Sequence, residues 1–137
     1  MNDILKLARI QLLIIILFTL FKFIRPSVLD SDAPNLFKII LLSLPNFFEG
    51  IVGVLTLTAI LLYIRSKTTR IKAQIKVTSI YFIATTLSAI YVITQELKIH
   101  NLGGNNVFDT NDLLFSVVGL LTGYLIILQI QPKISIS

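Results

Sequence analysis

Four acidic side chains stand at the ends of long apolar segments, where their type and spacing could do chemistry. Glu49 follows Pro45 by four residues, Glu96 closes one apolar run, and Asp109 and Asp112 open the next. If these runs are consecutive membrane spans, all four residues fall at one side of the membrane. Carboxylates gathered in a low-dielectric rim need protonation or a nearby cation. We therefore expect an acidic ligand-binding rim at Asp109, Asp112, Glu96 and Glu49, with Arg25 available for a phosphate or carboxylate.

Helix capping alone would account for the two aspartates. Asp109 is suited to be an N-cap, and Asp112 three residues later would favour the positive end of the helix dipole. This alternative leaves Glu49 and Glu96 unexplained.

Several kinds of chemistry are excluded by residue counts. The chain has no cysteine and a single histidine, His100, so neither a thiolate nor a histidine-rich metal site can form within it. No serine–histidine–acid set and no phosphate-binding loop can be assembled. We expect a protein that is not an enzyme and that needs no cofactor and no metal.

Composition determines the class of protein that positions these residues. Of 137 residues, 55% are hydrophobic and only 14% are charged, whereas soluble domains have about 25% charged residues. We predict an all-α membrane protein: a bundle of four transmembrane helices that forms one domain over 1–137. The predicted spans are residues 4–24, 45–64, 77–98 and 112–130. The first resembles a signal peptide, but no small-residue cleavage site follows it, so we expect a retained anchor.

Pro45 divides the apolar stretch 36–64, which is too long for one simple span. Because proline suits the first turn of a helix and disrupts its interior, we expect a short interfacial or re-entrant helix at 36–44 before the second span. A single long kinked helix is the competing interpretation, since transmembrane helices tolerate proline.

Small and polar residues indicate how the helices pack. Small residues let helix backbones approach closely, and we assign this role to Gly50, Gly53, Ser116, Gly119 and Gly123. A polar stripe on the third span shares one helical face and should point into the bundle. It consists of Thr78, Tyr81, Thr85, Ser88 and Gln95. Hydrogen bonding between helices is the simpler explanation of the stripe, and a polar translocation path is the alternative.

The distribution of cations predicts the orientation. Cytoplasmic loops are enriched in lysine and arginine. With both termini cytoplasmic, eight cations lie inside: Lys6, Arg9, Arg65, Lys67, Arg70, Lys72, Lys76 and Lys133. Four then lie outside: Lys22, Arg25, Lys38 and Lys98. Because the basic cluster lies in a loop between apolar spans, we expect no nucleic-acid partner despite the net charge of +5.

The segment that opens the last span resembles a known family. Phe108-Asp109-Thr110-Asn111-Asp112, followed by Ser116 and Gly119, is similar to the aromatic–Asp–x–x–Asp signature of VanZ-like membrane proteins. Leu44-Pro45-Asn46-Phe47 is similar to the opening of their second helix, and Glu96 stands where they often have a glutamate. Ser116 replaces the family's usual asparagine. The resemblance implies a small integral protein of a bacterial cytoplasmic (inner) membrane with an acidic extracytoplasmic rim.

From these features we expect binding of an envelope component at the rim: a lipid headgroup, a cell-wall precursor or an amphiphilic antibiotic. The expected partners are membrane lipids and, in addition, other membrane subunits or a second copy of the chain. An alternative hypothesis is a small accessory subunit of a larger membrane complex. Transport would require oligomerisation, because four helices are few and no charge is predicted at mid-membrane on the polar stripe.

Overall fold

The computed structural model describes residues 3–97 and 109–134, without the side chains of 72 and 73, and these residues form five helices. The elements in chain order are α1 (Asp3–Leu29), α2 (Asn35–Lys67), α3 (Thr69–Gln74), α4 (Val77–Glu96) and α5 (Thr110–Ile130). Four of them, all except α3, are long and apolar enough to cross a membrane. The all-α bundle of four spans is therefore confirmed, and the chain is a multi-pass membrane protein.

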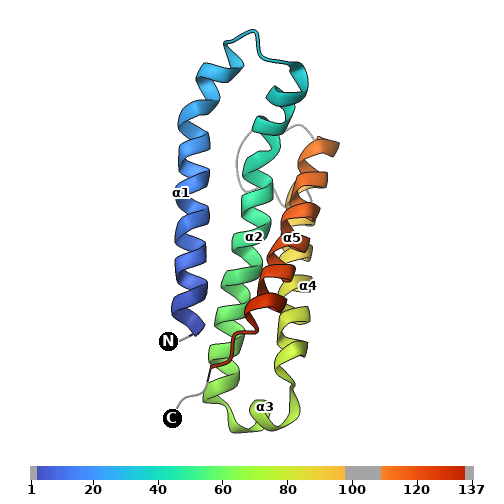
Figure 1. The fold of residues 1–137 in the computed structure, drawn as a ribbon. Coiled ribbons are helices and arrows are strands. Elements are labelled where there is room, and N and C mark those ends of the chain that lie inside the picture. The colour runs from blue at the N-terminus through green and yellow to red at the C-terminus, as the bar shows by residue number, and fades with distance from the viewer. Residues whose placement is uncertain (1–2, 98–108, 135–137) are drawn as a thin grey trace.

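Helix α2 is the centre of the bundle (Figure 1). It packs against α1, α4 and α5, and α4 packs also against α5, whereas α1 makes extensive contact with α2 alone. Because α1 covers only one side of α2, much of α1 remains exposed, including Leu12, Leu13 and Phe23. Lipid is the environment that suits such a surface.

The predicted break before Pro45 is wrong. Residues 36–44 are not a separate interfacial or re-entrant helix: α2 continues from Asn35 to Lys67 with Pro45 inside it. Proline removes one backbone donor, which leaves the carbonyl of Leu41 without its usual partner four residues on. A membrane helix tolerates this loss when neighbours pack around the site, and both Leu41 and Ser43 are buried there. The single long helix was the competing interpretation.

Other helix ends differ more modestly from the prediction. Helix α1 runs through Pro26 to Leu29 instead of ending at 24, and the Pro26 carbonyl accepts a hydrogen bond from the Asp30 amide. The basic loop contains the short helix α3, which was not predicted. Helix α5 begins two residues earlier than expected, at Thr110. Helix α4 ends at Glu96, and the predicted end at Lys98 lies outside the described residues.

The closest packing joins α2 to α5 through glycine. A Cβ atom on Gly119 would collide with the backbone carbonyl of Phe47, and one on Gly50 would lie 2.8 Å from the Ser116 carbonyl oxygen. A Cβ atom on Gly123 would come within 3.0 Å of Val54 Cβ. Packing in membranes relies on such close backbone approach. The packing role predicted for Gly50, Gly119, Gly123 and Ser116, which is 0% exposed, therefore agrees with the geometry.

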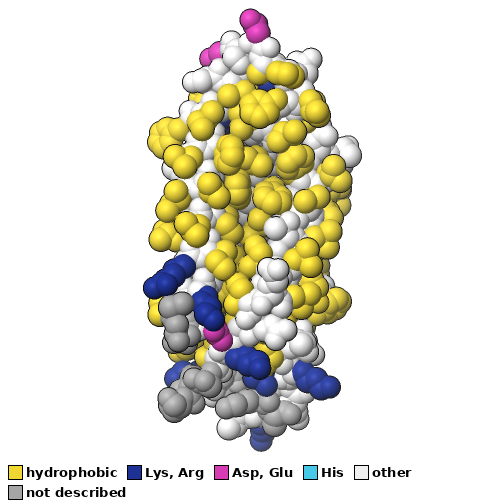
Figure 2. Space-filling view, in the orientation of Figure 1, with side chains coloured by type: hydrophobic (Ala, Val, Ile, Leu, Met, Phe, Trp, Pro, Cys, Tyr) yellow, Lys and Arg dark blue, Asp and Glu magenta, His cyan; other side chains and the backbone are white. Residues whose placement is uncertain are grey.

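Both ends of the chain meet at the end of the bundle that carries α3 (Figure 1). The backbone amide of Lys133 donates to Asp3 Oδ2 at 2.9 Å, and the buried Tyr81 hydroxyl donates to the Pro132 carbonyl at 2.8 Å. Lysine and arginine side chains gather at this end, while apolar side chains cover the middle of the visible face (Figure 2). The predicted grouping of the termini with the 65–76 loop is therefore seen in the fold.

Candidate ligand-binding rim and groove

The four predicted acidic residues converge at the end of the bundle opposite the termini. The charges of Asp112, Glu49 and Asp109 all act on the carboxyl group of Glu96, so three helices contribute to one electrostatic cluster. No ion pair or side-chain hydrogen bond to a cation involves any of the four within the described residues. The acidic rim, here Glu49, Glu96, Asp109 and Asp112, thus has no basic partner in this part of the chain.

Asp109 also caps the N-terminus of α5, which was the alternative explanation for an aspartate at this position. Its carboxylate accepts a hydrogen bond of 2.9 Å from the Asn111 backbone amide at the start of α5. Asp112 lies in the first helical turn, where the helix dipole favours a negative charge. Capping therefore accounts for the position of Asp109 but not for the two glutamates on α2 and α4.

Glu49 lies deeper than the other members of the acidic rim. Gly53 on α2 faces Ser88 on α4, which sets the two helices in register. Glu49 precedes Gly53 by four residues and Glu96 follows Ser88 by eight. At about 1.5 Å per residue, the Glu49 backbone is therefore about 6 Å further into the membrane than that of Glu96. Its side chain is exposed on the surface of the bundle. An ionisable side chain at such a depth marks a functional site by default.

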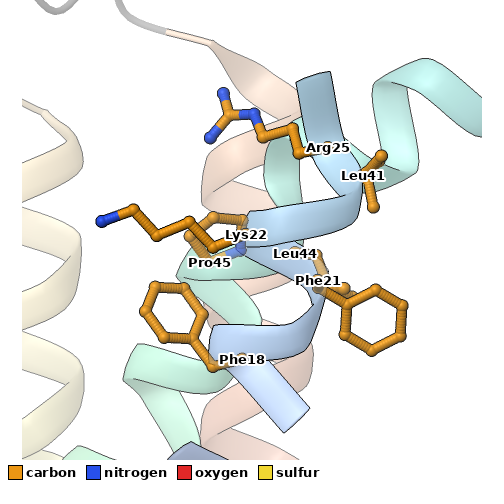
Figure 3. Close-up of a pocket in the computed structure, with 7 residues that line it drawn as sticks. All are labelled: Phe18, Phe21, Lys22, Arg25, Leu41, Leu44 and Pro45. Carbon is orange, nitrogen blue, oxygen red and sulfur yellow. The ribbon is translucent and has the colours of Figure 1, made fainter. Parts of the chain in front are cut away.

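Two cations of α1 lie toward the same end of the bundle as the acidic rim. Figure 3 shows Lys22 and Arg25 extending to the same side of α1 as Phe18, while Phe21 points the other way. This follows from the spacing of 18, 22 and 25, which places the three residues on one helical face. With Phe21, Leu41, Leu44 and Pro45 they line a cavity of about 250 Å³ between α1 and α2. Arg25 was predicted as a site residue; Lys22 was not.

Two further cavities continue inward from this one and meet at Glu49. The first, about 400 Å³, lies between α1 and α2 and is lined by Ile14, Ile15, Phe18, Pro45, Phe48, Glu49 and Val52. The second, about 420 Å³, lies between α2 and α4 and is lined by Glu49, Val52, Gly53, Thr56, Leu57, Ser88, Tyr91 and Val92. Because both include Glu49 and Val52, they adjoin on the surface of α2. We call these two cavities together the α2 groove.

A buried polar atom lies at the floor of the α2 groove. Ser88 is only 2% exposed, and its Oγ has no hydrogen-bond partner among the described residues. A Cβ atom on Gly53 would lie 3.6 Å from this Oγ, in ordinary contact. Unlike the other three glycines, Gly53 therefore makes no tight backbone contact, and the close packing predicted for it is not observed.

The predicted polar stripe of α4 points mostly into the bundle. Tyr81 and Ser88 are buried, Thr85 and Gln95 are half-buried, and Thr78 is exposed. Thr85 donates to the Tyr81 carbonyl within the same helix, and Tyr81 reaches Pro132. Along the part of the stripe near the acidic rim, Ser88 Oγ and Gln95 Oε1 have no described partner.

Sequence reasoning missed Lys22 and the hydrogen bond that joins α1 to α2. Gln11 Nε2 donates to Thr56 Oγ1 at 2.8 Å across the two helices. The spacing of Phe18, Lys22 and Arg25 was a usable signal for Lys22, whereas nothing in the sequence pairs Gln11 with Thr56. Among the described residues, no group of three or more histidine, cysteine or acidic side chains could hold a metal ion.

The comparisons with known proteins return nothing for this chain. No family model, no curated protein and no solved structure matches it.

Proposed function

We propose that this protein binds the headgroup of an amphiphilic envelope component at the extracytoplasmic end of a bacterial cytoplasmic membrane. The acidic rim would accept a cationic group of the ligand, and Lys22 and Arg25 would bind its phosphate or carboxylate. The similarity of the 108–119 segment to VanZ-like proteins is consistent with such a role, and we propose that membership on those residues alone.

The observation that carries the proposal is the separation of charge across the α2 groove. Four carboxylates lie on α2, α4 and α5, and two cations lie on α1. The hydrogen bond between Gln11 and Thr56 sets these two residues at one level of the bundle. Lys22 lies eleven residues outward from this level on α1, and Glu49 lies seven residues outward from it on α2. The difference of four residues places Lys22 about 6 Å further out than Glu49, at about the level of Glu96. A headgroup with both a cation and an anion would complement this arrangement.

The alternative function is that of an accessory subunit in a larger membrane complex. The exposed side of α1, which packs extensively only against α2 among the described helices, favours it. An accessory subunit would co-purify with its partners in fixed stoichiometry, whereas a headgroup-binding protein would co-purify with lipid.

Headgroup binding is tested with short-chain lipid probes on purified protein in mild detergent. We expect dihexanoyl-phosphatidylethanolamine, which has an ammonium and a phosphate, to raise the melting temperature more than dihexanoyl-phosphatidylglycerol. The Glu96→Gln/Asp112→Asn variant should lose this difference. The matched control is Asp30→Asn/Asp32→Asn, because these acids are exposed on the turn between α1 and α2, outside the acidic rim. Equal shifts with both lipids in the wild type would refute the proposal.

The proposed orientation places both termini and α3 in the cytoplasm. The accumulation of cations at that end supports it. Since the chain has no cysteine, a Thr68→Cys variant has one reactive thiol. We expect no labelling by a membrane-impermeant maleimide in intact cells and full labelling after permeabilisation. Labelling in intact cells would reverse the orientation.

A further inference from the structure

We propose that the α2 groove holds an acyl chain of a bound phospholipid whose headgroup ammonium is bound by Glu49. This inference rests on the proposed function and identifies the ligand as a glycerophospholipid with an ammonium headgroup. It also makes Glu49 the residue at which the headgroup site and the chain site meet.

The dimensions of the groove fit one chain. From Glu49 to Leu57 the lining of α2 extends over eight residues, which is about 12 Å of helix at about 1.5 Å per residue. One leaflet of the hydrocarbon core is about 15 Å thick. Inward of Glu49 the groove is therefore long enough for most of one acyl chain. Cavities of about 400 and 420 Å³ also fall within the usual range of roughly 300–1,000 Å³ for ligand sites.

Charge complementarity selects the headgroup. The groove is apolar apart from a few polar groups, and Glu49 is the carboxylate that lines both of its cavities. An anionic lipid would place its charge against Glu49 and the rest of the acidic rim. An ammonium group would instead compensate Glu49, while the adjoining phosphate would lie toward Lys22 and Arg25 in the next cavity outward. This is the arrangement of charges in phosphatidylethanolamine.

The experiment measures lipid retention by native mass spectrometry. Protein is reconstituted with equal amounts of dipalmitoyl phosphatidylethanolamine and phosphatidylglycerol and then released in mild detergent. Because hydrogen bonds to charged groups are stronger than those between neutral groups, we expect the wild type to retain the ammonium lipid about tenfold more than the anionic one. Glu49→Gln, which preserves size, should reduce this preference to about one.

A second variant tests the groove itself. Val52 lines both cavities, so Val52→Phe should reduce the retained lipid about tenfold through lost space. Leu121→Phe is the matched control, because Leu121 is 58% exposed and lines none of the three cavities around α1 and α2. Circular dichroism should show that Val52→Phe is folded like the wild type, and Leu121→Phe should keep the melting shift with dihexanoyl-phosphatidylethanolamine.

The outcomes separate this inference from the function on which it rests. Equal retention of the two lipids, or equal losses in Val52→Phe and Leu121→Phe, would overturn the groove assignment even if the short-chain lipid still raises the melting temperature. A doubled protein mass without lipid in the wild type would show that a second copy occupies the groove, which would also overturn it. Loss of the short-chain shift in the wild type would contradict the proposed function itself.

Discussion

The two faces of α2 differ in how their small residues are used. Toward α5, Gly50 meets Ser116 and Leu120 so closely that no side chain fits between the backbones, and Gly119 meets Phe47 in the same way. Toward α1 and α4, Gly53 borders a cavity of about 420 Å³ with only ordinary contacts. The same residue type thus closes one face of the helix and leaves the other open.

Polar groups follow the same division. Around Gly50, Gly119 and Gly123 the α5 face is closely packed, and the cavity of about 220 Å³ on that face has an entirely apolar lining. The open face carries Glu49, and the cations of α1 stand above it. A membrane protein gains little from burying apolar surface against itself, because lipid is equally apolar. Its stability therefore depends on close contacts such as those between α2 and α5, and an open groove elsewhere can be tolerated. The close packing of the fold and the candidate site therefore lie on different faces of one helix.

The largest expected effect comes from adding a methyl group to the closed face. Gly119→Ala would place Cβ against the Phe47 carbonyl, and a backbone cannot turn aside as a side chain can. We expect a loss of about 3 kcal/mol, since overpacking costs about 1–3 kcal/mol and sometimes more. The matched change on the open face, Gly53→Ala, should cost less than about 0.5 kcal/mol and even gain from helix propensity.

The measurement for this pair is unfolding in detergent, followed by circular dichroism. The closed-face variant should melt far below the wild type and the open-face variant close to it. Similar melting of both variants would mean that the two faces are packed alike.

The class of fold was predictable from the sequence because it depends on composition and length. Four runs of apolar residues require four spans, and Gly50, Gly119 and Gly123 indicated close packing correctly. The continuity of α2 through Pro45 was not predictable, because local propensity disfavours it and only packing around Leu41 and Ser43 accommodates it.

The candidate site was predictable in part. The convergence of Glu49, Glu96, Asp109 and Asp112 follows from topology and was expected. The α2 groove was not, because it depends on α1 packing extensively against α2 but not against α4. Periodicity locates the apolar faces of helices but does not say which neighbour covers each face.

A smaller effect is expected for the buried hydrogen bond that joins α4 to the segment after α5. Tyr81→Phe removes the buried hydrogen bond to the Pro132 carbonyl and leaves that carbonyl without its donor. We expect a loss of about 1–2 kcal/mol, as for an unsatisfied buried group. Thermal unfolding checks the magnitude, and limited proteolysis should show earlier cleavage after residue 130. An unchanged melting temperature would mean that the C-terminal segment adds nothing to stability.

The smallest effect is expected on the open side. Gln11→Leu removes the side-chain hydrogen bond between α1 and α2. Such bonds in membranes average about 0.6 kcal/mol, so the variant should melt within one or two degrees of the wild type. Thr56→Val should behave the same way, and the double variant should add no further loss. A large loss in either single variant would show that polar contacts rather than apolar ones hold α1 in place.

The difference between the two faces of α2 is tested most directly by comparing the maleimide labelling rates of single cysteines placed at two nearby positions of α2. The chain has no cysteine, so Val52→Cys and Val54→Cys each carry one thiol, about 3 Å apart in depth at about 1.5 Å per residue. Val52 lines the groove, whereas Val54 is 0% exposed and packs toward Gly123. In nanodiscs, a lipid-soluble maleimide should label Val52→Cys at least tenfold faster than Val54→Cys. Equal rates would contradict the assignment of one closed and one open face.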